Sequence, residues 1–441
     1  MDHRDALHMD TDVLVVGGGA AGVAAAVTAA RQGPRVTLLE RYGFCGGGAV
    51  AGLSGTICGL YEASDDPNAP PRQVVHGFVD EFARVLENRG GLTLPVRYGK
   101  TFTRVHDPLV WREAADHLLH EAGVRVLLHA TVIETLVEGG DKVEGVVAYT
   151  KQGKLTARAK LTIDASGDAD LAAMSGLPTR VGQDGRVQNP TMMFRLGGVD
   201  VAKFLTTYGP DSIMGTEVSD LMHRLHNQQQ YRLPRTKIFL FPTSRPGELL
   251  CNCTRVIGAD GRELNPLLAA DLSEAEVEGR RQVREYARFF ADHLAGCEAS
   301  FVNDTGVQVG VRQTRQITGA RTLTNEDVVK GAKFATGIAR SPWPIELHSG
   351  DKPRLQWLIR DYYEVPYECF IPERGESLLI AGRCLSAEHE AMASARVTAQ
   401  CFSYGHAIGH AAAIAVKDRV APRAINGRDI RERLNRDRAR L

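Results

Sequence analysis

The sequence has no excess of charge of either sign. Its 441 residues include 53 Lys and Arg and 53 Asp and Glu, so the formal net charge is zero. A protein that binds nucleic acid or a lipid surface through its overall field carries a basic excess, so this balance argues against both partners. No apolar run approaches the roughly 20 residues that span a bilayer. Residues 1–11 are polar and lack the apolar core of a signal peptide. The sequence therefore predicts a cytoplasmic protein.

Closely spaced cysteines are also scarce. Of the eight cysteines, only Cys251 and Cys253 are near neighbours, and no Cys-x-x-Cys motif occurs. Metal sites and redox pairs usually need that spacing, so we expect reduced thiols and no metal. Cys45 and Cys58 are thirteen positions apart. A redox disulfide between them stays open as an alternative.

Glycine, in contrast, is concentrated near the N-terminus. Val13–Val16 is an aliphatic run that is long enough for one buried strand, and Gly17, Gly19 and Gly22 follow it as G-x-G-x-x-G. The alanine-rich residues 20–31 then predict a helix. In this context the first glycine makes a tight turn, the second admits a pyrophosphate, and the third lets helix and strand pack closely.

The residues after the glycines complete a dinucleotide-binding unit. The first amides of the predicted helix, those of Ala20 and Ala21, would face the phosphates. Residues 35–39 predict the next strand, and Glu40 stands at its end. That position is about 20 residues beyond the motif, as expected for a carboxylate that binds a ribose hydroxyl. The unit predicts a dinucleotide without saying which one.

The fold class predicted for the whole chain is α/β, with a Rossmann-like domain, an inserted β-meander and a second α+β domain. Residues 1–175 would form the first part of the nucleotide-binding domain, with the meander over residues 124–161. Residues 176–340, which include a long charged helix over 273–293, would form the substrate domain. Residues 341–420 would return to the first domain, and 421–441 would be a solvated basic tail.

Four segments, taken together, resemble the FAD-dependent oxidoreductase family of glutathione-reductase-like flavoproteins, which is distantly related to the fumarate reductase and succinate dehydrogenase flavoproteins. Their order and spacing along the chain agree with that family. The segments are residues 12–43 with Gly46 and Gly47, residues 163–168, residues 310–315 with 323–327, and residues 379–386 with Arg396.

The resemblance implies FAD as the cofactor and assigns residues to it. The glycines of the motif would hold the pyrophosphate, Glu40 the ribose, and the C-terminal strand would approach the cofactor from the other side. For Asp164 the capping of a following helix is left open as an alternative. The implied cofactor residues are Gly17, Gly19, Ala20, Ala21, Gly22, Glu40, Arg41, Gly46, Gly47, Val132, Asp164, Gly167, Gly382 and Arg383.

The candidate catalytic residues are Arg312, Arg315 and His348. The two arginines could grip a carboxylate bidentately, although a buried ion pair is the alternative. His348 lies in a proline-fixed segment, and its ordinary pKa suits a proton carrier. Further candidates are Tyr367, His389 and Arg396. His406 and His410 have helical spacing that suits a metal, but no third ligand is evident in the sequence, so packing is favoured.

These observations predict an enzyme that transfers a hydride between flavin N5 and a small organic substrate, which could carry a carboxylate. Two other classes stay open: an RNA-modifying flavoprotein and a non-catalytic, flavin-binding redox module. No second G-x-G-x-x-G follows a strand later in the chain, so the electron acceptor is unknown. The sequence leaves a homo-oligomer open.

Overall fold

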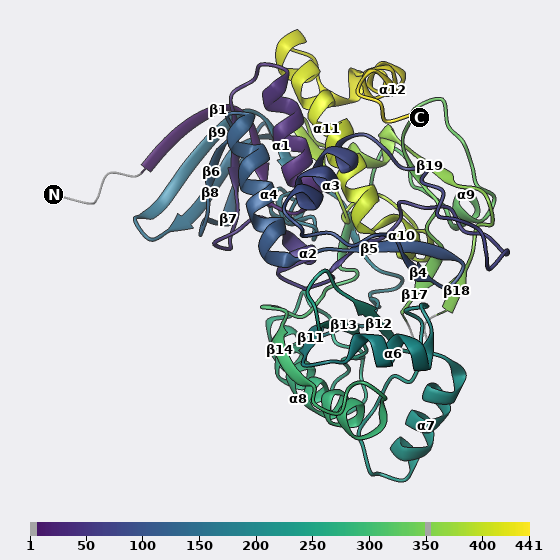
Figure 1. Ribbon diagram of the computed structural model, residues 1–441. Coiled ribbons are helices and arrows are strands. Elements are labelled where there is room, and N and C mark those ends of the chain that lie inside the picture. Colours follow the sequence, from purple (N-terminus) through teal and green to yellow (C-terminus); the bar gives the residue numbers. More distant parts are fainter. Residues whose placement is uncertain (1–6, 349–353) are drawn as a thin grey trace.

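The computed structural model describes residues 7–348 and 354–441. Its largest element is a seven-stranded mixed sheet in the order β6-β2-β1-β9-β8-β7, with β20 beside the end of β9 (Figure 1). The parallel strands are β1 (Leu7–Val16), β2 (Val36–Leu39), β6 (Arg125–Leu127), β9 (Gly153–Asp164) and β20 (Leu378–Ile380). The antiparallel strands are β7 (Thr131–Glu138) and β8 (Lys142–Thr150). The sheet confirms the predicted Rossmann-like α/β class.

The predicted β-meander is smaller than expected. Residues 125–127 form β6, which pairs in parallel with β2 and so belongs to the nucleotide-binding part of the sheet. The meander consists of β7, β8 and the first half of β9. Because β9 is one twelve-residue strand, it closes the meander and continues along β1 to Asp164. The strand β9 thus forms both the last strand of the meander and the return to the parallel sheet, which the sequence predicted as two separate strands.

Two helices of small residues lie side by side on the parallel strands. They are α1 (Ala20–Arg31) and α11 (Thr398–Asp418), seen together in Figure 1. A Cβ atom added to Gly405 would lie 2.1 Å from the carbonyl oxygen of Ala21, and one added to Gly409 would lie 2.7 Å from that of Ala25. Only glycine permits this approach, which confirms the tight packing predicted for the C-terminal helix.

A four-stranded antiparallel sheet forms the second unit, below the first in Figure 1. Its order is β12-β13-β11-β14, with bounds Phe239–Pro242, Leu249–Asn252, Phe194–Gly197 and Phe301–Thr305. The helix α8 (Ala269–His293) buries Val283, Tyr286, Phe289 and Phe290 in the same core as Phe194. This helix begins four residues before the predicted start.

The remaining helices and strands belong to these two units or lie between them. The helices are α2 (Gly47–Val50), α3 (Phe78–Asn88), α4 (Pro108–Glu121), α5 (Asp170–Met174), α6 (Val201–Tyr208), α7 (Thr216–Asn227), α9 (Asn325–Val329), α10 (His389–Ala395) and α12 (Gly427–Arg436). The strands are β3 (Thr56–Ile57), β4 (Val96–Tyr98), β5 (Thr101–Val105), β10 (Thr179–Val181), β15 (Arg315–Ile317), β16 (Gly337–Ser341), β17 (Ile345–Leu347), β18 (Arg354–Gln356) and β19 (Tyr363–Pro366).

The C-terminal residues do not form the solvated tail that was predicted. Ile430 and Leu434 of α12 are buried in the main hydrophobic core, as is Ala439 after it. Most charged residues of this amphipathic helix are exposed, whereas Arg431 is half-buried and pairs with the buried Glu364. Among residues 7–348 and 354–441, no helix has both the length and the apolar character needed to cross a membrane.

Candidate active site

The turn between β1 and α1 shows why its three glycines are needed. Gly17 has a φ of +105°, and a Cβ atom there would lie 2.4 Å from the carbonyl oxygen of Ala165. A Cβ atom on Gly22 would lie 1.8 Å from the carbonyl oxygen of Gly17, so Gly22 serves helix–strand packing. A Cβ atom on Gly19 would meet only the Cα atom of Gly47, at 3.8 Å. The turn is closed at two glycines and open at the middle one.

The open side of this turn faces a cavity of about 360 Å³. Gly19, Ala20 and Ala21 line it, so the cavity meets the amino end of α1. The first turn reads Ala-Ala-Gly and contains no acid, and Gly19 at the N-cap has no side chain to accept a bond from the helix amides. An uncapped helix start of this kind attracts a phosphate group.

Glu40 follows β2 and lines the same cavity. Its Oε2 atom accepts a hydrogen bond from the Gly18 amide at 2.6 Å, and Oε1 accepts one from the Tyr42 amide at 2.9 Å. Burial raises the pKa of this carboxyl, against the opposing effect of the two amide donors. The side chain is held at the edge of the glycine turn, where a carboxylate oxygen can accept from a ribose hydroxyl.

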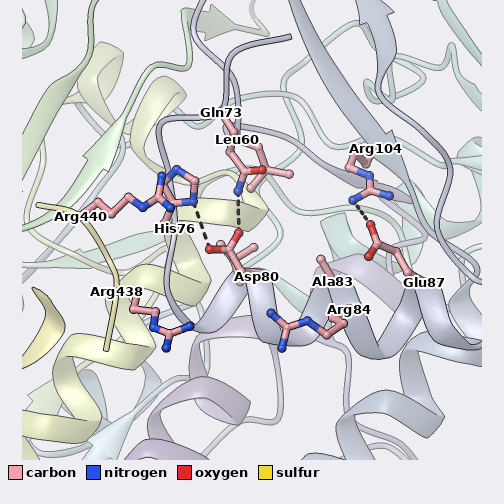
Figure 2. A pocket seen from close by; sticks show the side chains of 11 residues that line it. Leu60, Gln73, His76, Asp80, Ala83, Arg84, Glu87, Arg104, Arg438 and Arg440 are labelled. Carbon is pink, nitrogen blue, oxygen red and sulfur yellow. Dashed lines mark hydrogen bonds and ion pairs between the residues drawn. The ribbon is translucent and has the colours of Figure 1, made fainter. Parts of the chain in front are cut away.

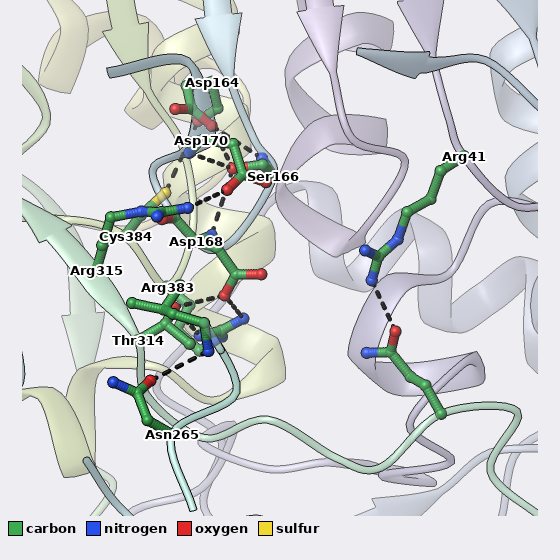
Figure 3. A network of polar contacts seen from close by, with 12 residues as sticks. Arg41, Asp164, Ser166, Asp168, Asp170, Asn265, Thr314, Arg315, Arg383 and Cys384 are labelled. Atoms are coloured by element: carbon green, nitrogen blue, oxygen red, sulfur yellow. Dashed lines mark hydrogen bonds and ion pairs between the residues drawn. The ribbon is translucent and has the colours of Figure 1, made fainter. Parts of the chain in front are cut away.

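A polar network closes the opposite wall of the cavity (Figure 3). Arg383, just after β20, donates to Oδ1 of Asp168 at 2.7 Å and to the Thr314 hydroxyl at 3.2 Å. Burial acts to raise the pKa of Asp168, but the Arg383 charge and the hydrogen bonds that Thr314 and Arg383 donate to this carboxylate outweigh it and lower the value. Gly167 has a φ of +82° and lies beside the Arg383 guanidinium. A Cβ atom added to Gly167 would lie 3.1 Å from a terminal nitrogen of that guanidinium. The network places one cation beside the glycine turn.

Asp164 and Arg315 do not line this cavity. Oδ2 of Asp164 accepts from the amides of Leu171 and Ala172 at 2.9 and 3.2 Å, so it caps α5, the alternative that the sequence left open. Burial raises the pKa of Asp164 to about 6. Arg315 forms an ion pair with Asp170, and its Nε donates to the Asp168 carbonyl at 3.0 Å (Figure 3). Its guanidinium is committed to this structural contact, so the structure does not support its predicted role as a substrate clamp.

At the inner end of the cavity, His348 and Arg312 come together. Both are 8% exposed. Nε2 of His348 lies 2.9 Å from Oε1 of Glu346, which also accepts the Tyr98 hydroxyl at 2.9 Å. Oε2 of Glu346 accepts the indole N–H of Trp343 at 3.2 Å. A buried carboxylate with three donors is thus placed directly behind the histidine.

The pKa values of His348 and Glu346 are both lowered, for different reasons. Burial lowers the pKa of His348 well below its usual value, and the Arg312 charge lowers it further. For Glu346, burial acts to raise the pKa, but the hydrogen bond to His348 and the charges of Arg396 and Arg312 outweigh it and lower the value to about 2. At neutral pH the site therefore holds a neutral imidazole against an ionised carboxylate.

Three arginines lie near His348 and Glu346. Arg235 and Arg312 both donate to Oδ1 of Asn252, at 2.9 and 3.4 Å, and Arg312 also donates to the carbonyl of Asn189 at 2.9 Å. Arg396 donates to Oε1 of Gln188 at 3.1 Å. Burial lowers the pKa of all three, that of Arg396 to about 10. Glu346 is the carboxylate whose charge acts on each of them.

The other sequence candidates lie apart from this cluster, except for Cys58, which lines the cavity as a free thiol. Cys45 is buried outside the lining, also as a free thiol, so the structure contains no disulfide between them. The hydroxyl of Tyr367 donates to the carbonyl of Pro422, and His389 stands at the start of α10, outside the cavity lining.

Most residues implied by the sequence meet at one cavity. Those that line it are Gly17, Gly19, Ala20, Ala21, Glu40, Arg41, Gly46, Gly47, Val132, Gly167, Gly382, Arg383, Arg312 and His348. Sequence reasoning missed Glu346, Asn252 and Gln188. For Glu346 a signal existed, because it lies on β17 two positions before His348, which directly follows the strand, and side chains two positions apart in extended backbone point to the same side.

The shape and chemistry of the lining fit FAD. Gly19 and Gly48 both line the cavity, and a Cβ atom added to Gly48 would meet nothing within 4 Å. The amino end of α11 also reaches the cavity, through Thr398 and Cys401. The amino ends of α1 and α11 suit a diphosphate, the wall formed by Gly19 and Gly48 leaves room for a flat flavin ring, and the Glu40 carboxylate suits a ribose hydroxyl.

Comparisons with known proteins agree with this geometry. A family model described as FAD dependent oxidoreductase matches residues 12–434. A solved geranylgeranyl bacteriochlorophyll reductase-like protein from Thermoplasma acidophilum is 15% identical, with a TM-score of 0.50 over 98% of this chain and 84% of that chain. A flavin-dependent brominase is 13% identical, with a TM-score of 0.51 over 97% and 84%. At these identities the two structures show the shared fold alone. No curated protein matches the sequence.

Proposed function

This chain belongs to the FAD-dependent oxidoreductase family, and from that premise we propose that it transfers a hydride between a small carboxylate-bearing substrate and FAD. When bound, FAD supplies a ring nitrogen, N5, that accepts or delivers the hydride. The carboxylate preference rests on the arginines at the inner end of the cavity. The proton transfer is assigned to His348.

The observation that carries this proposal is the uncompensated positive charge beside the flavin-sized cavity. The charge of one buried carboxylate, Glu346, acts on Arg235, Arg312 and Arg396, of which Arg312 and Arg396 line the cavity. This carboxylate already accepts three hydrogen bonds. Within the described part of the chain, Nε of Arg396 is buried without a hydrogen-bond partner. Burying unpaired guanidinium charge is costly, and a bound substrate anion would offset that cost. Planar guanidinium groups bind carboxylates bidentately.

In this proposal His348 holds the proton that leaves or joins the substrate. Its Nε2–H donates to Glu346, which leaves Nδ1 as the acceptor. Within residues 7–348 and 354–441, the hydrogen bond of the His348 ring joins Nε2 to Glu346. Glu346 fixes the ring and stabilises its protonated form, and Tyr98 and Trp343 fix Glu346. Arg312 and Arg396 hold the substrate anion.

The test is an anaerobic survey of substrates that follows bleaching of the flavin absorption. We expect bleaching by some small carboxylates and much slower bleaching by their amides or esters. Arg396→Gln should lower the second-order rate constant of reduction about 10- to 100-fold, since it removes a charge-assisted hydrogen bond. Arg340→Gln is the matched control, because Arg340 is also half-buried but lies outside this cavity. Equal rates for acids and amides, or equal losses in both variants, would refute the carboxylate preference.

A further inference from the structure

Two histidines of α11 and an aspartate just after α12 lie together, outside the lining of the cavity that fits FAD. His406 and His410 stand one turn apart on this helix, and Asp437 directly follows α12. Oδ2 of Asp437 lies 3.0 Å from Nε2 of His406 and 2.7 Å from Nε2 of His410. One ligand atom from each residue lies within 4.8 Å of the other two. We propose that these three side chains bind a divalent transition metal of the zinc type.

The arrangement needs little change to accept such an ion. Zn²⁺ bonds to imidazole nitrogen and carboxylate oxygen at about 2.0–2.2 Å in a tetrahedral site, which sets ligand atoms roughly 3.3 Å apart. The two nitrogen–oxygen distances, 3.0 and 2.7 Å, would therefore open by about 0.3 and 0.6 Å, and the two imidazole nitrogens, which lie within 4.8 Å of each other, would take up the same separation. The Asp437 side chain is 43% exposed and can make this adjustment, whereas both histidines are held on one helix.

The donor set also suits such an ion, because imidazole nitrogen and carboxylate oxygen are both ligands that zinc takes. The competing interpretation is a clamp in which the two imidazoles and the carboxylate are joined by hydrogen bonds without an ion.

A metal here would fix the end of the chain against α11. The residues just after Asp437 include Arg438 and Arg440, whose φ values of +65° and +57° are unfavourable for residues other than glycine. Both arginines reach a second cavity of about 360 Å³, beside His76 and Asp80 (Figure 2). Ion binding would therefore hold a strained turn and the two cations that it carries. This inference does not depend on the proposed redox reaction.

The test uses the full-length protein with FAD bound, freed of metal by a chelator and then desalted. Equilibrium dialysis against Zn²⁺ should give one tightly bound equivalent, and Mg²⁺ or Ca²⁺ should not compete, because they prefer oxygen ligands. Asp437→Asn and His410→Gln should each weaken Zn²⁺ binding at least about 100-fold, since each removes one ligand. Zn²⁺ should raise the melting temperature of the parent and leave that of Asp437→Asn unchanged.

Two control variants separate this site from general effects. Asp429→Asn changes an exposed carboxylate on the same helix, α12. His293→Gln changes a histidine on α8 that contacts Tyr231. Both should bind Zn²⁺ like the parent. If the parent binds Zn²⁺ no more tightly than Asp437→Asn, the three residues form a hydrogen-bonded clamp and the proposal is wrong. Should His410→Gln fail to fold, Asp437→Asn still decides, because its side chain is partly exposed.

Discussion

Replacing Glu346 by glutamine tests whether the carboxylate behind His348 supports proton transfer. The carboxylate accepts Tyr98 and His348 at Oε1 and Trp343 at Oε2. A glutamine keeps the shape but offers one acceptor oxygen, so at least one donor loses its partner and faces an amide N–H instead. A buried unsatisfied donor costs about 1–3 kcal/mol of stability.

The kinetic effect of Glu346→Gln should exceed this structural cost. Glu346 opposes the lowering of the His348 pKa, so without its charge the pKa falls further and the imidazole becomes a weaker base. The protonated ring also loses its counter-ion. A positioned base of this kind contributes about 10²–10⁴-fold in rate. We therefore expect flavin reduction by a carboxylate substrate to slow by about that factor, with FAD retained, in anaerobic stopped-flow measurements.

Glu248→Gln is the matched control. Glu248 is also buried and accepts from Arg195, Thr243 and Asn303, at 3.2, 3.0 and 2.8 Å, but it lies outside the cavity. It should lose stability without losing reduction rate. If both variants slow equally, the effect is structural. If Glu346→Gln reduces at the parental rate with full FAD content, Glu346 does not act through His348.

The remaining predictions concern pH and the glycine turn. Because the pKa of His348 lies well below 6.5, its basic form persists as the pH falls from 8 through 6.5. In a pH–rate profile, kcat/KM for substrate oxidation should therefore stay level over this range and drop only in more acid solution. Arg312→Met removes a charge that lowers this pKa, so the acid limb should move to higher pH; an unmoved limb would remove His348 as the titrating group. Gly22→Ala should abolish FAD retention on gel filtration, because its Cβ atom would lie 1.8 Å from the Gly17 carbonyl oxygen; a yellow, folded variant would contradict that reasoning.

The sequence by itself determined the nucleotide-binding half of the cavity. The strand, the glycine turn, the helix and Glu40 follow one another between Leu7 and Glu40, so their relative placement is set by local geometry. Gly22 packs against Gly17, Gly17 packs against Ala165 just beyond β9, and Gly19 stays open, as the motif requires. Gly382 and Arg383 also met the cavity, because parallel strands end at the same edge of a sheet.

The inner end of the cavity was decided by the tertiary structure. Tyr98 and Glu346 are 248 positions apart, and Arg312 and Asn189 are 123 apart. The same holds for Arg315, whose side chain meets Asp170 at a separation of 145, and for Asp437, 27 positions beyond His410. Hydrophobic periodicity identifies each element, but it does not say which faces of distant elements meet. Those contacts depend on how the two sheets and the C-terminal helices pack, and packing is a property of the whole core.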